Sequence, residues 1–256
     1  MIDTAFFLQS GEIQESFLAG SKIAAAILTT LVVLEILSYD TVMALYKRDK
    51  KLYLEGLAMN FVNHIAFGIP IYVASSQFLM RKDETHASAL AIIAQIVGIL
   101  LIHSICFYEL HKTFHTVPGY YKYHKFHHRY NTYTPPSAAS AVSVVEYLVA
   151  YMGPFAVAGA IIRPYMTAFH ASILIVAAGN VLEHTPFLED WSQKYMPVFW
   201  VTTRDHLEHH RKLNVHFAAP TFDIDWVVER FTTTTTTGTC STPSSPSSPT
   251  IEPEQK

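Results

Sequence analysis

The stretch AIIAQIVGILLIHSICFYELHKTFHTVPGYYKYHKFHH, residues 91–128, runs from a long apolar segment directly into two histidine clusters. The apolar run, which begins at Ala87 and ends at Tyr108, contains no Asp, Glu, Lys or Arg. A segment of this length crosses a hydrocarbon layer of about 30 Å as an α-helix. Because the histidines start where the run stops, we expect them on a helix that emerges at one face of a membrane.

Histidine occurs 14 times, and most of these residues fall in three short motifs. The motifs are HKTFH (His111 and His115), HKFHH (His124, His127 and His128) and HLEHH (His206, His209 and His210). An offset of three or four residues places two rings on one face of a helix. The adjacent third histidine of each HxxHH motif points about 100° around the helix. This divergence predicts a site with two metals.

The remaining composition also indicates a membrane protein, because apolar residues make up 50% of the chain and charged residues 15%. Four more apolar segments are candidate spans: Ser21–Tyr46, Leu57–Met80, Val142–Ile162 and Tyr165–Val181. Pro70 predicts a kink in the second span, and Arg163-Pro164 predicts a hairpin between the last two. The sequence therefore predicts an all-α fold, an integral-membrane bundle of about four to five spans with a histidine-rich helical cap.

The two ends of the chain are expected to differ from this central domain, residues 21–231. Residues 1–20 are acidic and lack the basic and apolar regions of a cleavable signal peptide. Residues 232–256 are rich in Thr, Ser and Pro, which predicts disorder. The two cysteines, Cys106 and Cys240, are too few for a disulfide framework or a thiolate site and are read as incidental.

Charge predicts the orientation and excludes one class of partner. The loop KRDKK, Lys47–Lys51, is basic, and positively charged loops remain in the cytoplasm. Counting spans from this loop places Glu109–Ser140 and Glu183–Arg230 on the same side, so all three histidine motifs are expected at the cytoplasmic face. The formal net charge is −3 and the basic residues are scattered. The sequence therefore shows no row of basic residues that could bind the phosphates of nucleic acid.

The types of the candidate ligands restrict which metals could bind but do not identify one metal. Imidazole without thiolates suits iron, zinc, copper or nickel, but the three motifs together hold more histidines than a mononuclear zinc site uses. A dinuclear site is the simplest interpretation. His184, at the end of the fifth apolar segment, is positioned to join it, and Asp205 and Glu208 are candidates to orient neighbouring rings. His64, His86, His103 and His170 are predicted to be polar packing residues, although His103, two turns before His111, could line the approach.

These motifs resemble the fatty acid hydroxylase superfamily, which includes sterol desaturases and sterol methyl oxidases. The resemblance covers roughly residues 108–228 and includes all three histidine motifs. The lone histidine of the family is matched by His184, although Thr185-Pro186 follows it instead of Ser-Gly or Asp-Gly. After the last motif, Asn214 is matched and His216 stands where the family usually has Asn, so both are candidates to tune the site.

The resemblance implies a pair of iron ions that activates O2 with electrons from a separate redox partner, commonly cytochrome b5 and its reductase. It implies the membrane of the endoplasmic reticulum if the source is eukaryotic. The expected substrate is lipid-like: a sterol, a fatty acyl chain or a hydrophobic secondary metabolite. Hydroxylation and desaturation stay open at this point.

Two other functions are weighed against an oxygenase. A membrane zinc hydrolase or isomerase usually carries HExxH on a span, and that motif is absent from this sequence. A metal transporter usually places its polar ligands at the middle of the bilayer, whereas these motifs flank the spans at one face. Both comparisons favour the oxygenase.

Overall fold

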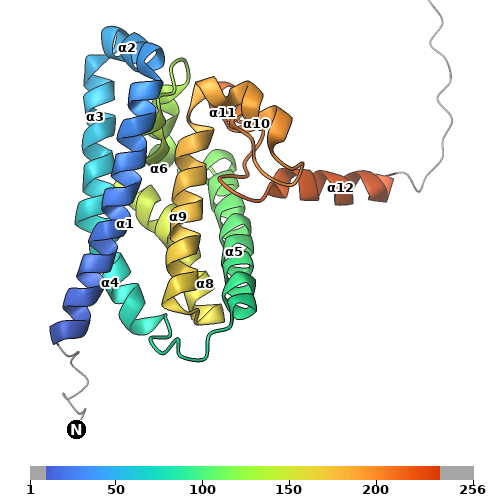
Figure 1. Cartoon of the computed structure of the whole chain (residues 1–256). Coiled ribbons are helices and arrows are strands. Elements are labelled where there is room, and N and C mark those ends of the chain that lie inside the picture. Colours follow the sequence, from blue (N-terminus) through green and yellow to red (C-terminus); the bar gives the residue numbers. More distant parts are fainter. Residues whose placement is uncertain (1–9, 237–256) are drawn as a thin grey trace, which may run out of the picture.

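The computed structural model describes residues 10–236, and the regular elements in this part of the chain are all helical (Figure 1). The elements are α1 (Ser10–Leu37), α2 (Tyr39–Arg48), α3 (Lys50–Phe61), η2 (Val62–Gly68), α4 (Ile69–Phe78), α5 (Ala89–Thr116), α6 (Tyr121–His124), η3 (His127–Tyr130), η4 (Pro136–Ser140), α7 (Val144–Glu146), η5 (Tyr147–Met152), α8 (Gly153–Ile162), α9 (Met166–Glu183), η6 (Pro186–Leu188), α10 (Glu189–Tyr195), α11 (Thr203–Lys212) and α12 (Ile224–Thr236). The predicted all-α class is confirmed.

Five of the described helical segments are long and apolar enough to cross a membrane, which confirms the predicted bundle. They are Gly11–Leu37, Lys50–Phe78, Ala89–Thr116, Val144–Ile162 and Met166–Glu183. Their outward side chains are largely apolar, since Val32, Ile36 and Phe61, for example, are exposed. In water such a surface would be unfavourable, and lipid is the solvent that suits it.

The first span begins and ends earlier than the predicted Ser21–Tyr46. Helix α1 starts at Ser10, stops at Leu37 and is followed by the separate short helix α2. The polar turns at the start of α1 are stabilised by α4 and the loop that follows it, because the Ser76 hydroxyl donates to the Ser16 hydroxyl over 2.8 Å and Lys82 pairs with Glu12. These contacts come from distant parts of the chain, so a count of apolar residues could not include them.

Two spans contain π-helical segments, and each segment lies just before a proline. In the second span η2 precedes Pro70, and in the fourth η5 precedes Pro154. Proline has no N–H to donate, and the widened turn changes the pairing before it: the Ile69 N–H bonds to His64 O and the Gly153 N–H to Leu148 O. The predicted irregularity at Pro70 is therefore a π-helical turn inside a continuous span.

The bundle places the three histidine motifs at one end. Helix α5 packs against α8 and α9, and α1 packs against α4 and α9, around a core that includes Ile99, Ala158 and Phe169. Helices α2, α6, α10 and α11 lie at one end of these spans, and the loop between α4 and α5 lies at the other (Figure 1). The three motifs thus share one end with the basic KRDKK segment, as the count of spans predicted.

Helix α12 extends sideways from the bundle and reaches Thr236, which is inside the segment predicted to be disordered. It is amphipathic over Ile224–Phe231, and its hydrogen bonds continue into the threonines, as from the Thr232 hydroxyl to Val228 O over 3.0 Å. Residues 1–9 and 237–256, including Cys240, lie outside the described residues. Cys106 is a free thiol in α5.

Candidate metal centre

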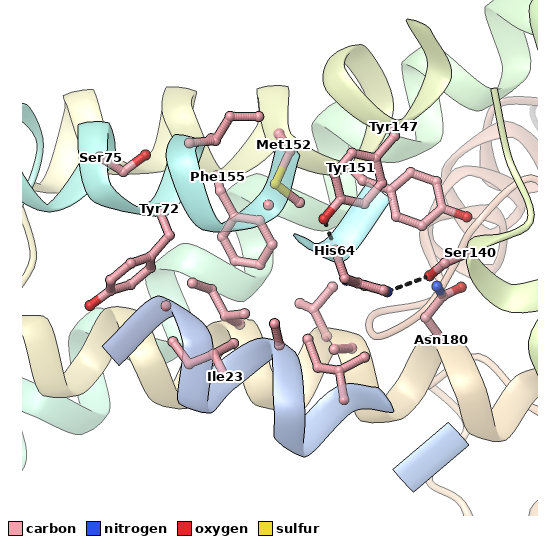
Figure 2. Close-up of a pocket in the computed structure, with 18 of the residues that line it drawn as sticks. Ile23, His64, Tyr72, Ser75, Ser140, Tyr147, Tyr151, Met152, Phe155 and Asn180 are labelled. Carbon is pink, nitrogen blue, oxygen red and sulfur yellow. Dashed lines mark hydrogen bonds between the residues drawn. The ribbon is translucent and has the colours of Figure 1, made fainter. Parts of the chain in front are cut away.

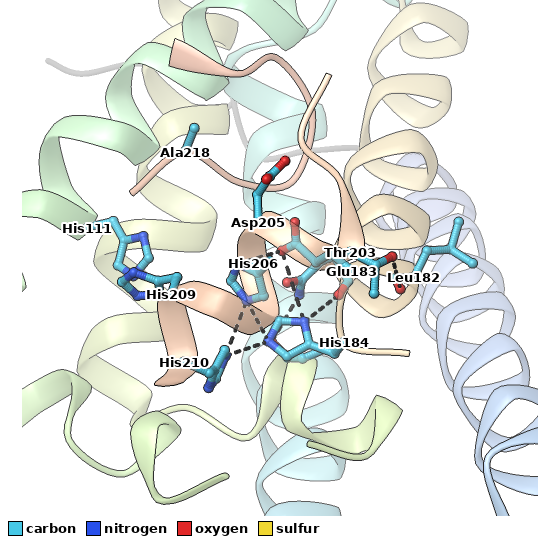
Figure 3. A network of polar contacts seen from close by, with 12 residues as sticks. His111, Leu182, Glu183, His184, Thr203, Asp205, His206, His209, His210 and Ala218 are labelled. Carbon is cyan, nitrogen blue, oxygen red and sulfur yellow. Dashed lines mark hydrogen bonds and ion pairs between the residues drawn. The ribbon is translucent and has the colours of Figure 1, made fainter. Parts of the chain in front are cut away.

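Nine histidines from five parts of the chain converge at the α11 end of the bundle, and Figure 3 shows five of them: His111, His184, His206, His209 and His210. They are His111 and His115 on α5, His124 on α6, His127 and His128 on η3, His184 at the end of α9, and His206, His209 and His210 on α11. These are the nine residues that the sequence predicted as ligands. The structure brings all of them together in two groups.

Local structure explains how the motifs aim their rings. Helix α5 continues through the first motif, so His111 and His115 are one turn apart on the same face. Helix α11 begins at a capping box in which the Thr202 hydroxyl accepts from Asp205 N–H and the Asp205 carboxylate accepts from Thr202 N–H. Because this box fixes the start of the helix, it also fixes the direction in which the HLEHH side chains point.

The five-histidine group consists of His111, His115, His124, His128 and His209, whose ligand atoms all lie within 4.8 Å of one another. The Nε2 atom of His124 is 3.0 Å from that of His111 and 2.8 Å from that of His128. His209 Nε2 lies 3.2 Å from His128 Nε2. Apart from the partly exposed His115, the group is buried.

The four-histidine group consists of His127, His184, His206 and His210, all buried and also within 4.8 Å of one another. His184 Nε2 lies 2.9 Å from His206 Nε2, 3.2 Å from His210 Nε2 and 3.4 Å from His127 Nε2. Figure 3 shows His184, His206 and His210 turned toward one another. The donors therefore surround a common point from different elements.

The two groups lie side by side because neighbouring residues divide between them. His128 and His209 belong to the five-histidine group, whereas their chain neighbours His127 and His210 belong to the other. The rings of His128 and His210 are 4.9 Å apart between centroids. Each HxxHH motif therefore does supply both sites, but the predicted pairing is wrong: His124 shares a group with His128, and His206 with His210. The middle histidine of each motif, and not the last, turns to the other group.

Hydrogen bonds at Nδ1 fix which ring nitrogen carries the proton. His111 Nδ1 is 2.8 Å from Phe217 O, His209 Nδ1 is 2.7 Å from Val215 O, and His184 Nδ1 is 2.6 Å from Asn180 O. A carbonyl oxygen can only accept, so each of these Nδ1 atoms donates. The Nε2 atom of each neutral ring then has a lone pair and no proton.

The donor set fits a metal cation. The Nδ1 of His124 donates to Glu146, 2.5 Å away, so the Nε2 atoms of His111 and His124 meet at 3.0 Å with no proton between them. Two lone pairs at this distance repel unless a positive charge lies between them. Converging neutral imidazoles are suitable ligands for a divalent transition metal, and two such groups could hold two ions.

Burial keeps these imidazoles neutral. Removal from water, followed by repulsion between neighbouring imidazoles, holds the pKa of His124, His206 and His210 well below the usual 6.5. Burial lowers the pKa of His184 to about 4 and that of His209 to about 3. At neutral pH the rings therefore present lone pairs, which is the form that binds metal.

Two buried carboxylates contact the rings, one in each group. Glu146 accepts from His124 of the five-histidine group. Glu183 Oε1 lies 3.7 Å from His206 Nδ1 and 4.0 Å from His184 Nδ1 in the four-histidine group (Figure 3). Neither glutamate is among the site residues predicted from the sequence. The available signal was a glutamate in or beside an apolar segment, since a buried charge there needs a partner.

The carboxylates that the sequence did propose as ring orienters have other partners. The Asp205 carboxylate accepts from the Thr202 hydroxyl over 2.6 Å and caps α11. Glu208 lies on the outer face of α11 and pairs with Lys212. In an HLEHH helix, the residue before the second histidine faces away from the rings, which explains the placement of Glu208.

Asn214 and His216, the other two tuning candidates, lie in the segment after α11. Asn214 is exposed, and His216 Nε2 is 3.7 Å from the Glu208 carboxylate. Neither belongs to the two histidine groups. The segment does support the centre through its backbone, because the carbonyl oxygens of Val215 and Phe217 accept from His209 and His111.

A cavity of about 90 Å³ lies among the spans (Figure 2), and two of its lining residues contact histidines of the centre. Phe107 lines it and also contacts His111, with 5.2 Å between ring centroids. Asn180 lines it as well and accepts from His184 through its backbone oxygen. The cavity therefore approaches both histidine groups through residues one turn away from them.

Comparison with known proteins identifies a family. The model of a family described as fatty acid hydroxylase matches residues 96–230, which contain all nine histidines. Searches of curated proteins and of solved structures found no match. The matched region coincides with the part of the chain in which the motifs suggested this superfamily, so the predicted resemblance is confirmed.

Proposed function

The chain belongs to the fatty acid hydroxylase family, and from this membership and the site geometry we propose that it is a membrane-bound di-iron oxygenase. It would hydroxylate or desaturate a lipid-like substrate, such as a sterol, a fatty acyl chain or a hydrophobic secondary metabolite. The observation that carries the proposal is the pair of adjacent histidine groups, five and four rings, whose ligand atoms converge within 4.8 Å in each group.

In this proposal each histidine group holds one iron ion. When bound, the two ions supply activation of O2 for attack on an unreactive C–H bond, with electrons from a separate donor. Imidazoles are neutral ligands, so the buried carboxylates of Glu146 and Glu183 are the groups that offset the positive charge of the centre. The Nδ1 atoms of His111, His184 and His209 donate hydrogen bonds to backbone carbonyl oxygens, which keeps each Nε2 directed inward.

The surroundings of the centre favour chemistry on an apolar molecule. The histidines are buried at the end of the spans, and the cavity leads from the membrane region to Phe107 and Asn180. A substrate in the cavity would reach the centre without passing through water, and exclusion of water protects a reactive oxidant from side reactions. These features support a lipid as the molecule oxidised.

The electron donor and the compartment follow from the family resemblance. We propose cytochrome b5 with its reductase as the donor and the endoplasmic reticulum membrane as the location in a eukaryote, with the histidine cap in the cytoplasm. The basic segment KRDKK lies at the same end as the cap, which supports this orientation. A protease-protection assay on sealed vesicles tests it.

Metal analysis combined with oxygen-dependent turnover tests the function. The detergent-purified protein is expected to contain about two irons per chain and to consume O2 with a lipid extract as substrate. A His127→Ala/His209→Ala double variant, which removes one ring from each group, should lose metal and turnover together. The matched control is His86→Ala in the exposed loop between α4 and α5. Stoichiometric zinc with oxygen-independent activity, or movement of metal across vesicles, would contradict the proposal.

A further inference from the structure

The cavity among the spans has a distinctive distribution of polar groups. One end is lined by His64, Ser140 and Asn180, and the opposite end by Tyr72 and Ser75 (Figure 2). The wall between the ends is formed by apolar side chains such as those of Ile23, Phe155 and Val176. Along α9 the lining extends from Phe169 to Asn180, about 16 Å at 1.5 Å per residue. The space suits an elongated apolar molecule.

Among the described residues that line the cavity there is no Asp, Glu, Lys or Arg. A carboxylate or phosphate buried in such a space would lack a counter-charge, and burial of an unpaired charge is strongly unfavourable. The lining does offer hydrogen-bonding groups. The cavity therefore favours an uncharged ligand over an anionic one.

One of these polar residues lacks a partner. His103 is only 1% exposed, and both of its ring nitrogens are without a hydrogen bond among the described residues. Its ring lies 4.7 Å from that of Phe155 and 6.1 Å from that of Phe107, measured between centroids. Buried polar atoms in native proteins nearly always have a partner, so an orphaned ring beside a cavity indicates a missing ligand or water.

The other cavity histidine differs from His103 in this respect. His64 Nε2 is 3.1 Å from the Ser140 hydroxyl, and His64 Nδ1 is 3.5 Å from the Tyr147 hydroxyl (Figure 2). Its hydrogen-bonding capacity is used within the protein. His103 is thus the cavity residue with both a donor and an acceptor to offer to a ligand.

We propose that the cavity binds an uncharged lipid with a hydroxyl or ketone oxygen, and that His103 is the hydrogen-bond partner of this oxygen. The inference rests on the proposed function only in taking the cavity as the substrate site. His103 lies two helical turns from His111, about 12 Å along α5. It is therefore a specificity-determining residue held within the membrane region, away from the metal ligands.

Equilibrium binding of three probes with the same alkyl chain tests the proposal on the full-length, metal-loaded protein. The probes are dodecane, dodecanol and dodecanoate. The wild-type protein should bind dodecanol about tenfold more tightly than dodecane, the size expected for one buried hydrogen bond, and should bind dodecanoate more weakly than dodecanol. Equal affinity for dodecane and dodecanol, or tighter binding of dodecanoate, overturns the proposal.

Variants at His103 then assign the contact. His103→Phe keeps an aromatic ring between Phe107 and Phe155 and should lose the preference for dodecanol while it still binds dodecane. His103→Gln retains a donor and an acceptor and should recover part of the preference. His86→Phe, in the exposed loop, is the matched control and should behave as the wild type. A dodecanol preference that persists in His103→Phe overturns the role of His103.

The same preparations separate this proposal from the proposed function. Iron content and oxygen-dependent turnover are measured beside the binding constants. Normal iron and turnover with no dodecanol preference overturn the cavity proposal and leave the proposed function standing. A dodecanol preference that depends on His103, in a protein that holds no iron, supports the cavity assignment and contradicts the oxygenase.

Discussion

The Nδ1 atom of His124 and the Oε1 atom of Glu146 lie 2.5 Å apart, although the two residues are 22 positions apart in sequence and are carried by α6 and α7. Both side chains are buried, with 3% and 2% of their surface exposed. A carboxylate that accepts from Nδ1 fixes the tautomer and makes Nε2 a stronger donor to a metal. This contact therefore connects the packing of the fourth span to the five-histidine group.

Replacement of Glu146 by Gln should weaken metal binding at the five-histidine group. The change keeps the side-chain volume but removes the negative charge, and loss of such a partner typically costs about 10- to 100-fold in metal affinity. Iron titration of the metal-free protein measures the effect. Glu208→Gln is the control, because Glu208 lies on the outer face of α11 with Lys212. An unchanged affinity in Glu146→Gln would show that the contact does not tune the centre.

Replacement of Glu183 by Gln should act on the other group. Glu183 approaches His206 and His184, which belong to the four-histidine group. At limiting iron the variant is expected to retain one tight ion and lose the second, so the stoichiometry should fall from about two toward about one. The Glu146→Gln/Glu183→Gln double variant should lose both. Equal effects of Glu183→Gln on both sites would contradict the division into two groups.

The spacing of the motifs was sufficient to predict eight of the nine histidines that come together, because three- and four-residue offsets have fixed directions on a helix. His184 lies outside the motifs and was predicted from its place at the end of the fifth apolar segment. The same reasoning failed for the carboxylates. It selected Asp205 and Glu208 because they are neighbours in sequence, but one caps α11 and the other faces outward. Glu146 reaches His124 only through the tertiary packing of α6 against α7.

The fold was predictable to a similar degree. The five spans were predictable from the length of the apolar segments, since a helix that crosses a membrane must be long and apolar. Their ends were less accurate where polar residues pair across the bundle, as Ser16 does with Ser76 in the first span. The cavity was not predictable, because it depends on how side chains from different spans leave space between them.

Acidification should destabilise the metal-free protein below a pH of about 6.5. Burial lowers the pKa of His184 to about 4 and that of His209 to about 3, whereas an unfolded histidine titrates near 6.5. Between these values the unfolded chain binds more protons than the native one, so the free energy of unfolding decreases as the pH falls. It should be nearly constant above 6.5. Thermal unfolding of the metal-free protein in detergent, measured from pH 4 to pH 8, tests this, and a stability that rises on acidification would contradict it.

The position of η3 should depend on a glycine in the second span. A methyl group on Gly56 would collide with the hydroxyl of Tyr130 and lie 3.1 Å from its Cζ atom. Tyr130 is 1% exposed and donates to Leu52 O over 2.9 Å, so it has little freedom to move. Gly56→Ala is therefore expected to destabilise the protein by about 1–3 kcal/mol, the usual cost of overpacking.

A shift of Tyr130 should also disturb the metal centre, because Tyr130 belongs to the same short helix as His127 and His128. Gly56→Ala should lower iron affinity as well as the melting temperature. Gly11→Ala is the matched control: nothing lies within 4 Å of the added methyl group, and alanine in a helix is favoured by roughly 0.5–1 kcal/mol over glycine. If Gly56→Ala matches Gly11→Ala in melting temperature and iron titration, then η3 tolerates the shift and Tyr130 does not position the histidines beside it.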